Sequence, residues 1–331
     1  MERLKIYQKK DIEKLISTRK GEKKFGEELI FIKNLNELEN HSAQYVLLGI
    51  PEDIGIRANS GKSGASKAWN AALKALVNIQ INRYNDPSKM ILLGELKCEE
   101  WMQKSANIDA QDPNYFAKYG DIVKEIDETL SEIIEKIVSK GKIPVIVGGG
   151  HNNAYGNIKG TAKALKKPID VLNIDAHTDL RQLEHRHSGN GFSYAIEGQF
   201  LCKYHIFGLH KNYTPEYIFE EMELSENISF QFMEDLLEFP DEAHRKFQTV
   251  LKEMNCSDMG LELDCDSIAD FPSSAMSPVG FTVNQVRDFI RKSKKTGVCR
   301  YFHICEAAPD DKNEGQVGKA LAYFISDFIQ N

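Results

Sequence analysis

The stretch Val171-Leu-Asn-Ile-Asp175-Ala-His177-Thr-Asp179 decides how we interpret this chain. Its first four residues are mostly apolar, which predicts a buried strand, and two acids and an imidazole follow at alternate positions. If the extended backbone continues to Asp179, these three side chains point to one face and converge at the C-terminal end of the strand. Two carboxylates and one imidazole suit a divalent ion such as Mn²⁺. For this stretch taken alone, a strand that ends in solvated acids is the alternative.

Apolar runs of strand length recur along the chain and alternate with helical patterns. Further strands are predicted at 45–50, 90–94, 143–147, 204–209, 228–232, 259–263 and 300–305. Apolar residues recur at helical spacing from Ile122 to Ile137, and Gly141 then predicts the end of that helix. Because strands and helices alternate without a linker-like segment, we predict one α/β domain over residues 41–331, with a mainly parallel sheet.

Two segments fall outside this alternation. Residues 1–40 are charged and predict a peripheral N-terminal extension. Residues 98–120 are polar and contain Pro113, which predicts a loop or a lid.

Composition and charge exclude several classes of protein. The formal net charge of −7 argues against nucleic acid or an anionic membrane as a main partner. No apolar run approaches the roughly 20 residues of a membrane span, and the first ten residues lack the apolar core of a signal peptide. The 6 cysteines form no CxxC pair, so neither a disulfide framework nor a zinc ribbon is predicted. We expect a cytoplasmic protein.

Polar clusters follow four of the predicted strands, and such strand ends carry the sites of α/β sheets. The candidate ligands are His151 in Gly-Gly-Gly-His, Asp175, His177 and Asp179, and the pair Asp264 and Asp266; Glu306 ends a fourth strand. Alternation along the strand predicts that the carboxylates flanking Cys265 point the same way. If two of the carboxylates bridge, two imidazoles and four carboxylates suffice for two divalent ions about 3.5–4 Å apart. Without a cation the crowded carboxylates would repel one another. His205, His210 and His303 lie in strand-like runs and are interpreted as core or rim residues.

At these motifs the sequence resembles the ureohydrolase superfamily, which comprises arginases, agmatinases and formimidoylglutamases. GGGH at 148–151, DAHTD at 175–179 and DxD at 264–266 occur in the order and spacing of that family. The resemblance extends from about residue 45 to the C-terminus. It implies a three-layer α/β/α fold, a dinuclear manganese centre with two Mn²⁺ per chain, a homo-oligomer, and hydrolysis of a C–N bond in a guanidino or formimino group.

The resemblance also implies a role for each residue of the cluster. One ion would be bound by His151, Asp175, Asp179 and Asp264, and the other by Asp175, His177, Asp264 and Asp266. Asp179 would pass a proton to the leaving amine. Glu306 would orient the planar cationic group of the substrate.

The loop after the acidic cluster resembles the formimidoylglutamase branch. Gly191-Phe-Ser193 follows Ser188-Gly-Asn190, so the His that arginases and agmatinases carry there is absent unless His185 or His187 replaces it. The candidate contacts to the substrate are Arg181, Asn190 and His187. The planar donors of Arg181 suit a substrate carboxylate, and a surface salt bridge is the alternative for this residue.

The predicted reaction is therefore the hydrolysis of N-formimidoyl-L-glutamate to L-glutamate and formamide. Arginase, or the hydrolysis of another guanidino acid, is the alternative within the superfamily. A catalytically silent oligomeric relative is the alternative from another class. The expected partner is a small amidine or guanidine, with neither nucleic acid nor a membrane involved.

Overall fold

A 9-stranded sheet runs through the computed structural model, which describes residues 3–237 and 241–330. Its strands are β1 (Leu4–Ile6), β2 (Tyr45–Gly49), β3 (Met90–Leu96), β4 (Ile143–Val147), β5 (Ile169–Ile174), β6 (Leu201–Leu209), β7 (Ile228–Phe232), β8 (Met259–Asp264) and β9 (Cys299–Cys305). Their order across the sheet is β1-β3-β2-β4-β9-β8-β5-β6-β7. β1 is antiparallel to β3, and every other neighbouring pair is parallel. The predicted mainly parallel sheet is confirmed.

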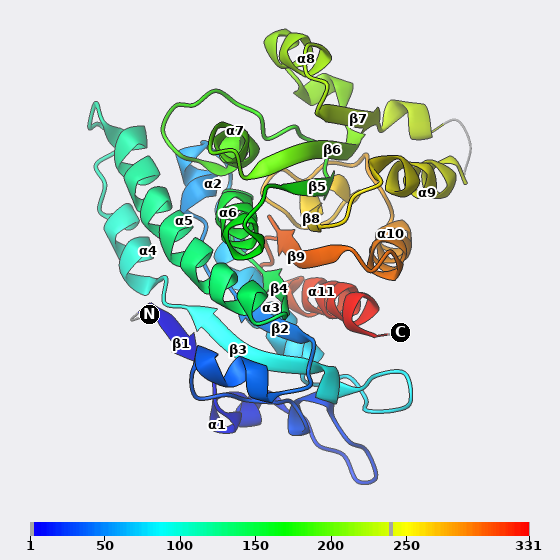
Figure 1. Cartoon of the computed structure of the whole chain (residues 1–331). Helices are drawn as coiled ribbons and strands as arrows, with labels where there is room; N and C mark the ends of the chain where they lie inside the picture. The colour runs from blue at the N-terminus through cyan, green and yellow to red at the C-terminus, as the bar shows by residue number, and fades with distance from the viewer. Residues whose placement is uncertain (1–2, 238–240, 331) are drawn as a thin grey trace.

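Helices cover both faces of this sheet (Figure 1). They are α1 (Lys9–Ile12), α2 (Ile54–Ala58), α3 (Ala68–Leu76), α4 (Glu99–Ala106), α5 (Tyr115–Ser139), α6 (Asn153–Leu165), α7 (Gly191–Glu197), α8 (Glu216–Glu223), α9 (Glu242–Met254), α10 (Val283–Lys295) and α11 (Glu314–Ile329). Side chains of α3, α9, α10 and α11 pack in one hydrophobic core, and those of α4 to α8 pack in a second.

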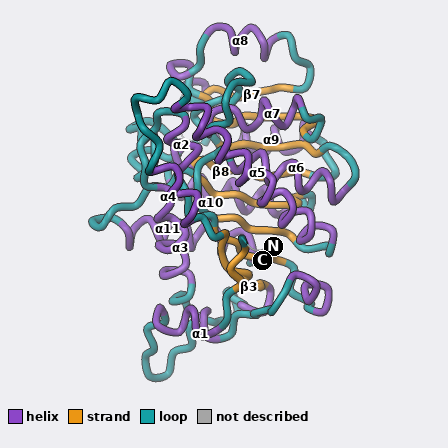
Figure 2. Tube along the Cα trace, turned by 90° about the vertical axis from the view of Figure 1, so that its left-hand side faces the viewer, coloured by secondary structure: helices purple, strands orange, loops and turns teal. Residues whose placement is uncertain are grey.

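Successive strand residues contribute to opposite cores, as the period of an extended chain requires. In β2, Leu47 packs with α3 and α11, whereas Val46 and Leu48 pack with α5. The fold therefore has the three α/β/α layers that the resemblance implied. Figure 2 shows the strands stacked one above the other between their helices.

The first forty residues join the fold through an edge strand. In β1, Leu4 pairs with Leu96 of β3. Ile12, Phe25, Leu35 and Leu38 of the following turns are at most 3% exposed. Apolar side chains thus tie this charged segment to the edge of the domain.

The prediction of a loop or lid over residues 98–120 holds only for residues 107–114 and is wrong for the rest of the segment. This segment contains α4, and α5 begins within it at Tyr115. Trp101 of α4 is fully buried, and its indole N–H donates to Glu125 of α5 at 2.8 Å. The buried indole and this hydrogen bond to α5 hold a helix where the polar composition indicated a loop.

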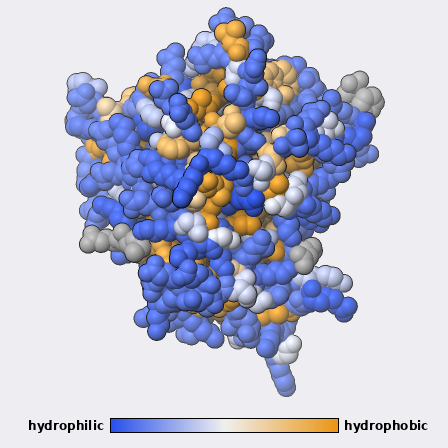
Figure 3. Space-filling model, in the orientation of Figure 1, coloured by the Kyte–Doolittle hydropathy of each residue, from blue (hydrophilic) through white to orange (hydrophobic). Residues whose placement is uncertain are grey.

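The surface seen in Figure 3 is mostly hydrophilic, with apolar residues scattered among the charged ones. Within the described residues, no helix combines the length and the apolar character that crossing a bilayer requires. Charged residues make up 27% of the chain, and most charged side chains of a folded protein lie at its surface.

Candidate metal centre

Polar side chains cluster at the C-terminal ends of β4, β9, β8 and β5, which are consecutive neighbours in the middle of the sheet. His151 follows β4, Glu306 follows β9, Asp264 ends β8 and Asp175 follows β5. Because parallel strands end at the same edge of a sheet, these side chains meet. Each of them is at most 3% exposed.

The imidazole of His151 contacts three carboxylates. Its Nδ1 is 2.9 Å from Asp179 Oδ2, 3.1 Å from Asp264 Oδ2 and 3.2 Å from Asp175 Oδ2. The ligand atoms of these four residues all lie within 4.8 Å of one another. The structure thus brings the first of the two predicted ligand sets together around one point.

The second predicted set shares Asp175 and Asp264 with the first and adds His177 and Asp266. His177 Nδ1 is 3.6 Å from Asp175 Oδ1 and 3.9 Å from Asp266 Oδ2. The His177 ring is partly exposed and stacks on Tyr213, with the ring centroids 5.2 Å apart. This set is more open than the first.

Turns, and not strand alternation, bring these side chains together. β5 ends at Ile174, so the condition that the extended backbone continues to Asp179 is not met. Asp175 Oδ1 accepts the His177 amide at 2.7 Å, and Asp179 has a left-handed backbone with φ of 51°. An Asx turn followed by a left-handed residue therefore sets the directions of the side chains.

The Asp264-Cys265-Asp266 segment departs from the strand in the same way. β8 ends at Asp264, whose Oδ1 accepts the Asp266 amide at 2.7 Å and caps the 3₁₀ turn Cys265–Ser267. Cys265 packs in the hydrophobic core while both carboxylates line the cavity. The two carboxylates thus point to one side and Cys265 to the other, as predicted, but a helical turn and not strand alternation produces this arrangement.

A buried carboxylate that the sequence analysis did not single out holds the turn before His151. Glu52 Oε1 accepts the Gly150 amide at 3.2 Å and the Asn153 side-chain amide at 2.7 Å. Gly149 has φ of 79°, and a Cβ there would lie 2.3 Å from Asn153 Nδ2. The glycine is required at this position for both its backbone conformation and its lack of a side chain. The position of Glu52, which follows Pro51 at the end of the buried strand 45–50, was the available signal.

Glu306 turns back toward His151 from the end of β9. Its backbone is left-handed, with φ of 61°. Its Oε1 accepts the His151 amide at 2.6 Å, whereas Oε2 has no hydrogen-bond partner in the part of the chain that the structure describes. Strained backbone of this kind, here at Asp179 and Glu306, is concentrated at functional sites.

Burial and mutual repulsion dominate the electrostatics of the cluster. Burial raises the pKa of Asp264 well above its usual range, and the charge of Asp266 adds to the shift. Burial and the charge of Asp266 raise the pKa of Glu306 to about 8. Burial lowers the pKa of His177, but the contact with Asp175 outweighs it and brings the value to about 10. Positive charge, as protons or as cations, therefore stabilises this group of carboxylates.

The donor set fits divalent ions of the manganese type. It offers carboxylate oxygens and imidazole nitrogens, the ligands that such ions accept. Among residues 3–237 and 241–330, neither ring nitrogen of His151 completes a hydrogen bond. A buried imidazole in this state beside three carboxylates is the arrangement expected of a metal ligand.

A cavity of about 230 Å³ opens beside the cluster. The charged, imidazole and phenol side chains that line it are His177, Asp179, Arg181, Tyr213, Asp264, Asp266 and Glu306. Arg181 forms no ion pair within the described residues, so the surface salt bridge considered for it is not observed there. Tyr213 was not predicted; its ring lies between those of His177 and His210, 5.2 Å from each.

His187 and Asn190, which were predicted to contact the substrate, are not among the residues that line this cavity. Both are buried. His187 Nε2 is 3.1 Å from Glu184 Oε1, and its Nδ1 accepts the Gly189 amide at 3.1 Å. The Asn190 side chain donates to the His185 carbonyl at 3.0 Å and accepts the His187 amide at 3.1 Å. Their polar atoms hold the loop together.

His185 does not supply the imidazole that is missing from the loop. Its Nε2 is 3.0 Å from the Ala58 carbonyl, and its ring stacks on Phe116 with the centroids 5.3 Å apart. His177 is the one imidazole among the described residues that line the cavity.

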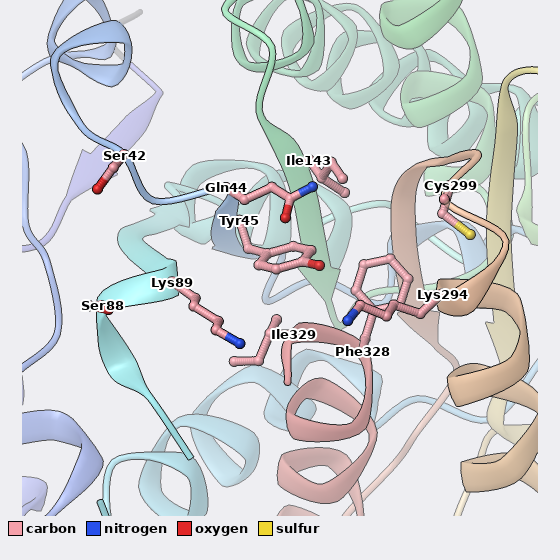
Figure 4. A pocket seen from close by; sticks show the side chains of 11 residues that line it. Ser42, Gln44, Tyr45, Ser88, Lys89, Ile143, Lys294, Cys299, Phe328 and Ile329 are labelled. Carbon is pink, nitrogen blue, oxygen red and sulfur yellow. The ribbon is translucent and has the colours of Figure 1, made fainter. Parts of the chain in front are cut away.

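A separate cavity of about 440 Å³ lies at the N-terminal ends of the strands, opposite the metal-centre side (Figure 4). Tyr45, Ile143 and Cys299, which line it, are the first residues of β2, β4 and β9. It shares no lining residue with the cavity beside His151. Of the motif residues, His177, Asp179, Asp264, Asp266 and Glu306 line the smaller cavity, and none lines the larger one.

Comparison with known sequences identifies relatives over most of the chain. A family model described as the arginase family matches residues 43–329. The formimidoylglutamase of Geobacillus sp. (strain WCH70) is 26% identical, with 98% of this chain and 96% of the relative covered. The formimidoylglutamase of Macrococcus caseolyticus (strain JCSC5402) is also 26% identical, with 84% and 82% covered.

Solved structures share the fold. Trypanosoma cruzi formiminoglutamase with Mn²⁺ superposes with a TM-score of 0.72 at 18% identity, covering 93% of this chain and 98% of that one. Formimidoylglutamase from Bacillus subtilis gives a TM-score of 0.70 at 17% identity, with 95% and 93% covered. At these identities the likeness concerns the arrangement of strands and helices.

Proposed function

Because this chain belongs to the arginase family, whose members are metal-dependent hydrolases of amidine and guanidine C–N bonds, we propose that it hydrolyses N-formimidoyl-L-glutamate. The products are L-glutamate and formamide, and the reaction uses two Mn²⁺ per chain. The two relatives described above carry the name of this activity.

The single observation that carries the proposal is the convergence of six nitrogen and oxygen ligands beside one cavity. His151, Asp175, Asp179 and Asp264 would hold one ion, and Asp175, His177, Asp264 and Asp266 the other. The distances of 2.9 to 3.2 Å between His151 Nδ1 and three carboxylates support the first set. Divalent ions bound there supply Lewis acidity and lower the pKa of water.

Two carboxylates at the cavity are suited to act on the substrate directly. Glu306 lines the cavity, its buried Oε2 has no hydrogen-bond partner within the described residues, and its carboxylate would accept N–H donors from the planar formimino group. Asp179 lines the same cavity and would take a proton from water and deliver it to the leaving amine. These two residues therefore have the roles of orienting the substrate and moving a proton.

Arg181 favours a substrate that carries a carboxylate. Arg181 is an exposed residue that lines the cavity, and its guanidinium has no carboxylate partner inside the described chain. The planar fork of donors matches the α-carboxylate of a formimidoyl amino acid. The cavity of about 230 Å³ limits the substrate to a small molecule.

A substrate panel with Mn²⁺-loaded protein tests the proposal. N-formimidoyl-L-glutamate, L-arginine and agmatine are supplied separately, and formamide and urea are quantified in parallel. We expect formamide from the first compound and no urea from the other two. Urea from L-arginine, with formimidoylglutamate left intact, would show that the protein is an arginase.

Metal analysis of the same preparation separates a silent relative from an enzyme that has another substrate. We expect close to two Mn²⁺ per chain after loading and removal of free metal. Well under one ion per chain, together with no turnover of any compound, would identify a catalytically silent protein. Asp264→Asn is the matched variant, because it removes the charge of a carboxylate common to both proposed ligand sets.

A further inference from the structure

A second buried polar cluster lies behind His151, on the side of its ring away from the three aspartates. It consists of Glu262 on β8 and of Tyr301 and His303 on β9, all of which are 0% exposed. Glu262 Oε1 accepts the Tyr301 hydroxyl at 2.7 Å, and Oε2 is 2.6 Å from His303 Nδ1. Burial of a carboxylate costs free energy unless hydrogen-bond donors or a positive charge surround it.

The carboxylate of Glu262 faces the ring nitrogen of His151 that points away from the aspartates. The distance from His151 Nε2 to Glu262 Oε2 is 3.5 Å, whereas His151 Nδ1 faces the three aspartates. The rings of His151 and Phe192 are perpendicular, at 90°, with the centroids 5.2 Å apart. An imidazole that offers Nδ1 to a cation carries its proton on Nε2, and a carboxylate is a common acceptor of that proton.

We propose that Glu262 is a positioning residue for the metal centre. Its carboxylate holds His151 as the Nε2–H tautomer and so directs the lone pair of Nδ1 toward the aspartates. Tyr301 and His303 fix the carboxylate from the neighbouring strand through the two contacts described above. This inference rests on the proposed function, because it takes His151 to be a ligand.

Glu262 and His303 could instead form a further ion site with His151 and Cys305. Their ligand atoms lie within 4.8 Å of one another. However, the 2.6 Å contact between His303 Nδ1 and Glu262 is a hydrogen-bond distance. His151 would also have to bind cations through both ring nitrogens at once. A carboxylate that faces His151 Nε2 and is itself held by Tyr301 and His303 therefore accounts for the cluster better.

The test is the Mn²⁺ affinity of Glu262→Gln, measured from the electron paramagnetic resonance signal of free Mn²⁺ during titration of the full-length protein. The amide keeps the size of the side chain and removes its charge. We expect affinity to fall by about 10- to 100-fold, the usual effect of losing a partner of a metal-binding His. Glu95→Gln is the matched control, since Glu95 lies on β3 and pairs with Lys5 at 2.8 Å. Its affinity should stay within about twofold of the unaltered protein.

Tyr301→Phe keeps the test decisive if circular dichroism shows that Glu262→Gln does not fold. This variant removes one hydrogen bond to Glu262 and leaves the charge, so it should weaken Mn²⁺ binding by less than tenfold. An affinity equal to that of the unaltered protein in Glu262→Gln, or in Tyr301→Phe if it alone folds, would overturn the inference. If the unaltered protein binds a third Mn²⁺ and Glu262→Gln loses it, the cluster is the further ion site considered above, and the inference is overturned. Unaltered protein that binds no Mn²⁺ would instead contradict the proposed function.

Discussion

Arg186 and Asp127 form a buried ion pair that joins the loop after the metal cluster to α5. Arg186 Nε is 2.8 Å from Asp127 Oδ2, and Nη2 is 3.2 Å from Oδ1. The guanidinium also donates to the carbonyls of His187 at 2.9 Å and Asn152 at 3.0 Å. One side chain thus connects the loop, α5 and the residue that follows His151.

Replacement of Arg186 by Met should lower the free energy of unfolding by about 3–5 kcal/mol. The variant leaves the Asp127 carboxylate buried without its cation, which is the costly part of the change. The double variant Asp127→Leu with Arg186→Met should lose less than Arg186→Met alone, because no buried charge remains. Urea unfolding of the three proteins measures this difference. A double variant that is less stable than Arg186→Met would contradict the explanation.

An exposed ion pair provides the control for these variants. Lys23 and Glu28 lie 3.2 Å apart, and both side chains are more than half exposed. Glu28→Gln should change stability by less than about 1 kcal/mol, because exposed pairs are screened by solvent. A larger loss would indicate that the urea measurement reports something other than buried charge.

Gly149→Ala tests the turn that presents His151. A left-handed backbone costs an alanine about 1–2 kcal/mol, and the contact of its Cβ with Asn153 and Glu52 should add about 1–3 kcal/mol. Gly141→Ala is the matched control, since Gly141 has φ of 70° and open space around a Cβ. Gly141→Ala should therefore show the backbone cost alone. Equal losses of unfolding free energy in the two variants would refute the role assigned to close packing at Gly149.

Arg181→Ala tests the proposed contact to the substrate carboxylate. Loss of a hydrogen bond to a charged group costs about 1.5–3 kcal/mol, which corresponds to about a 10- to 100-fold lower kcat/KM for formimidoylglutamate. Arg181→Lys should recover part of this loss as a point charge. A formamidine that lacks carboxylates is the control substrate, and both proteins should hydrolyse it equally. Equal losses on the two substrates would indicate that Arg181 acts on the site as a whole.

The types and positions of the residues near the strand ends could be predicted from the sequence, but their backbone geometry could not. Asp175, His177 and Asp179 could be predicted to converge because each motif follows a buried strand of a parallel sheet. Alternation along β5 was the wrong reason, since the strand ends at Ile174 and Asp179 is left-handed. A left-handed aspartate depends on tertiary contacts that no local pattern reports.

Buried polar partners were the part that the sequence could not reveal. Arg186 lies in a loop of charged residues, and nothing local indicates its burial, because its partner Asp127 is 59 residues away on α5. Glu262 interrupts an apolar strand, and its contacts with Tyr301 and His303 come from the neighbouring strand. Charges of this kind become interpretable only when the fold brings their partners together.

The acid sensitivity of the fold should depend in part on His205. This residue of β6 is 8% exposed, and burial lowers its pKa to about 4. Its Nδ1 lies 2.8 Å from the Ser229 hydroxyl of β7. A His in the unfolded chain has a pKa of about 6.5. Between this pH and pH 4, His205 is therefore protonated in the unfolded chain but neutral in the folded protein. The neutral ring therefore stabilises the fold above pH 6.5, and this contribution is lost as the pH falls toward 4.

His205→Asn isolates this contribution, because the amide mimics the contact at Nδ1 and does not titrate. Urea unfolding of both proteins at several pH values between 7 and 4 gives the difference in their free energies of unfolding. From pH 7 to pH 4, the unaltered protein should lose about 3 kcal/mol more than the variant. Metal ligands and other carboxylates titrate equally in both proteins, so their effects cancel in the difference. A difference that stays constant across this range would mean that His205 is protonated in the folded protein as readily as in the unfolded chain.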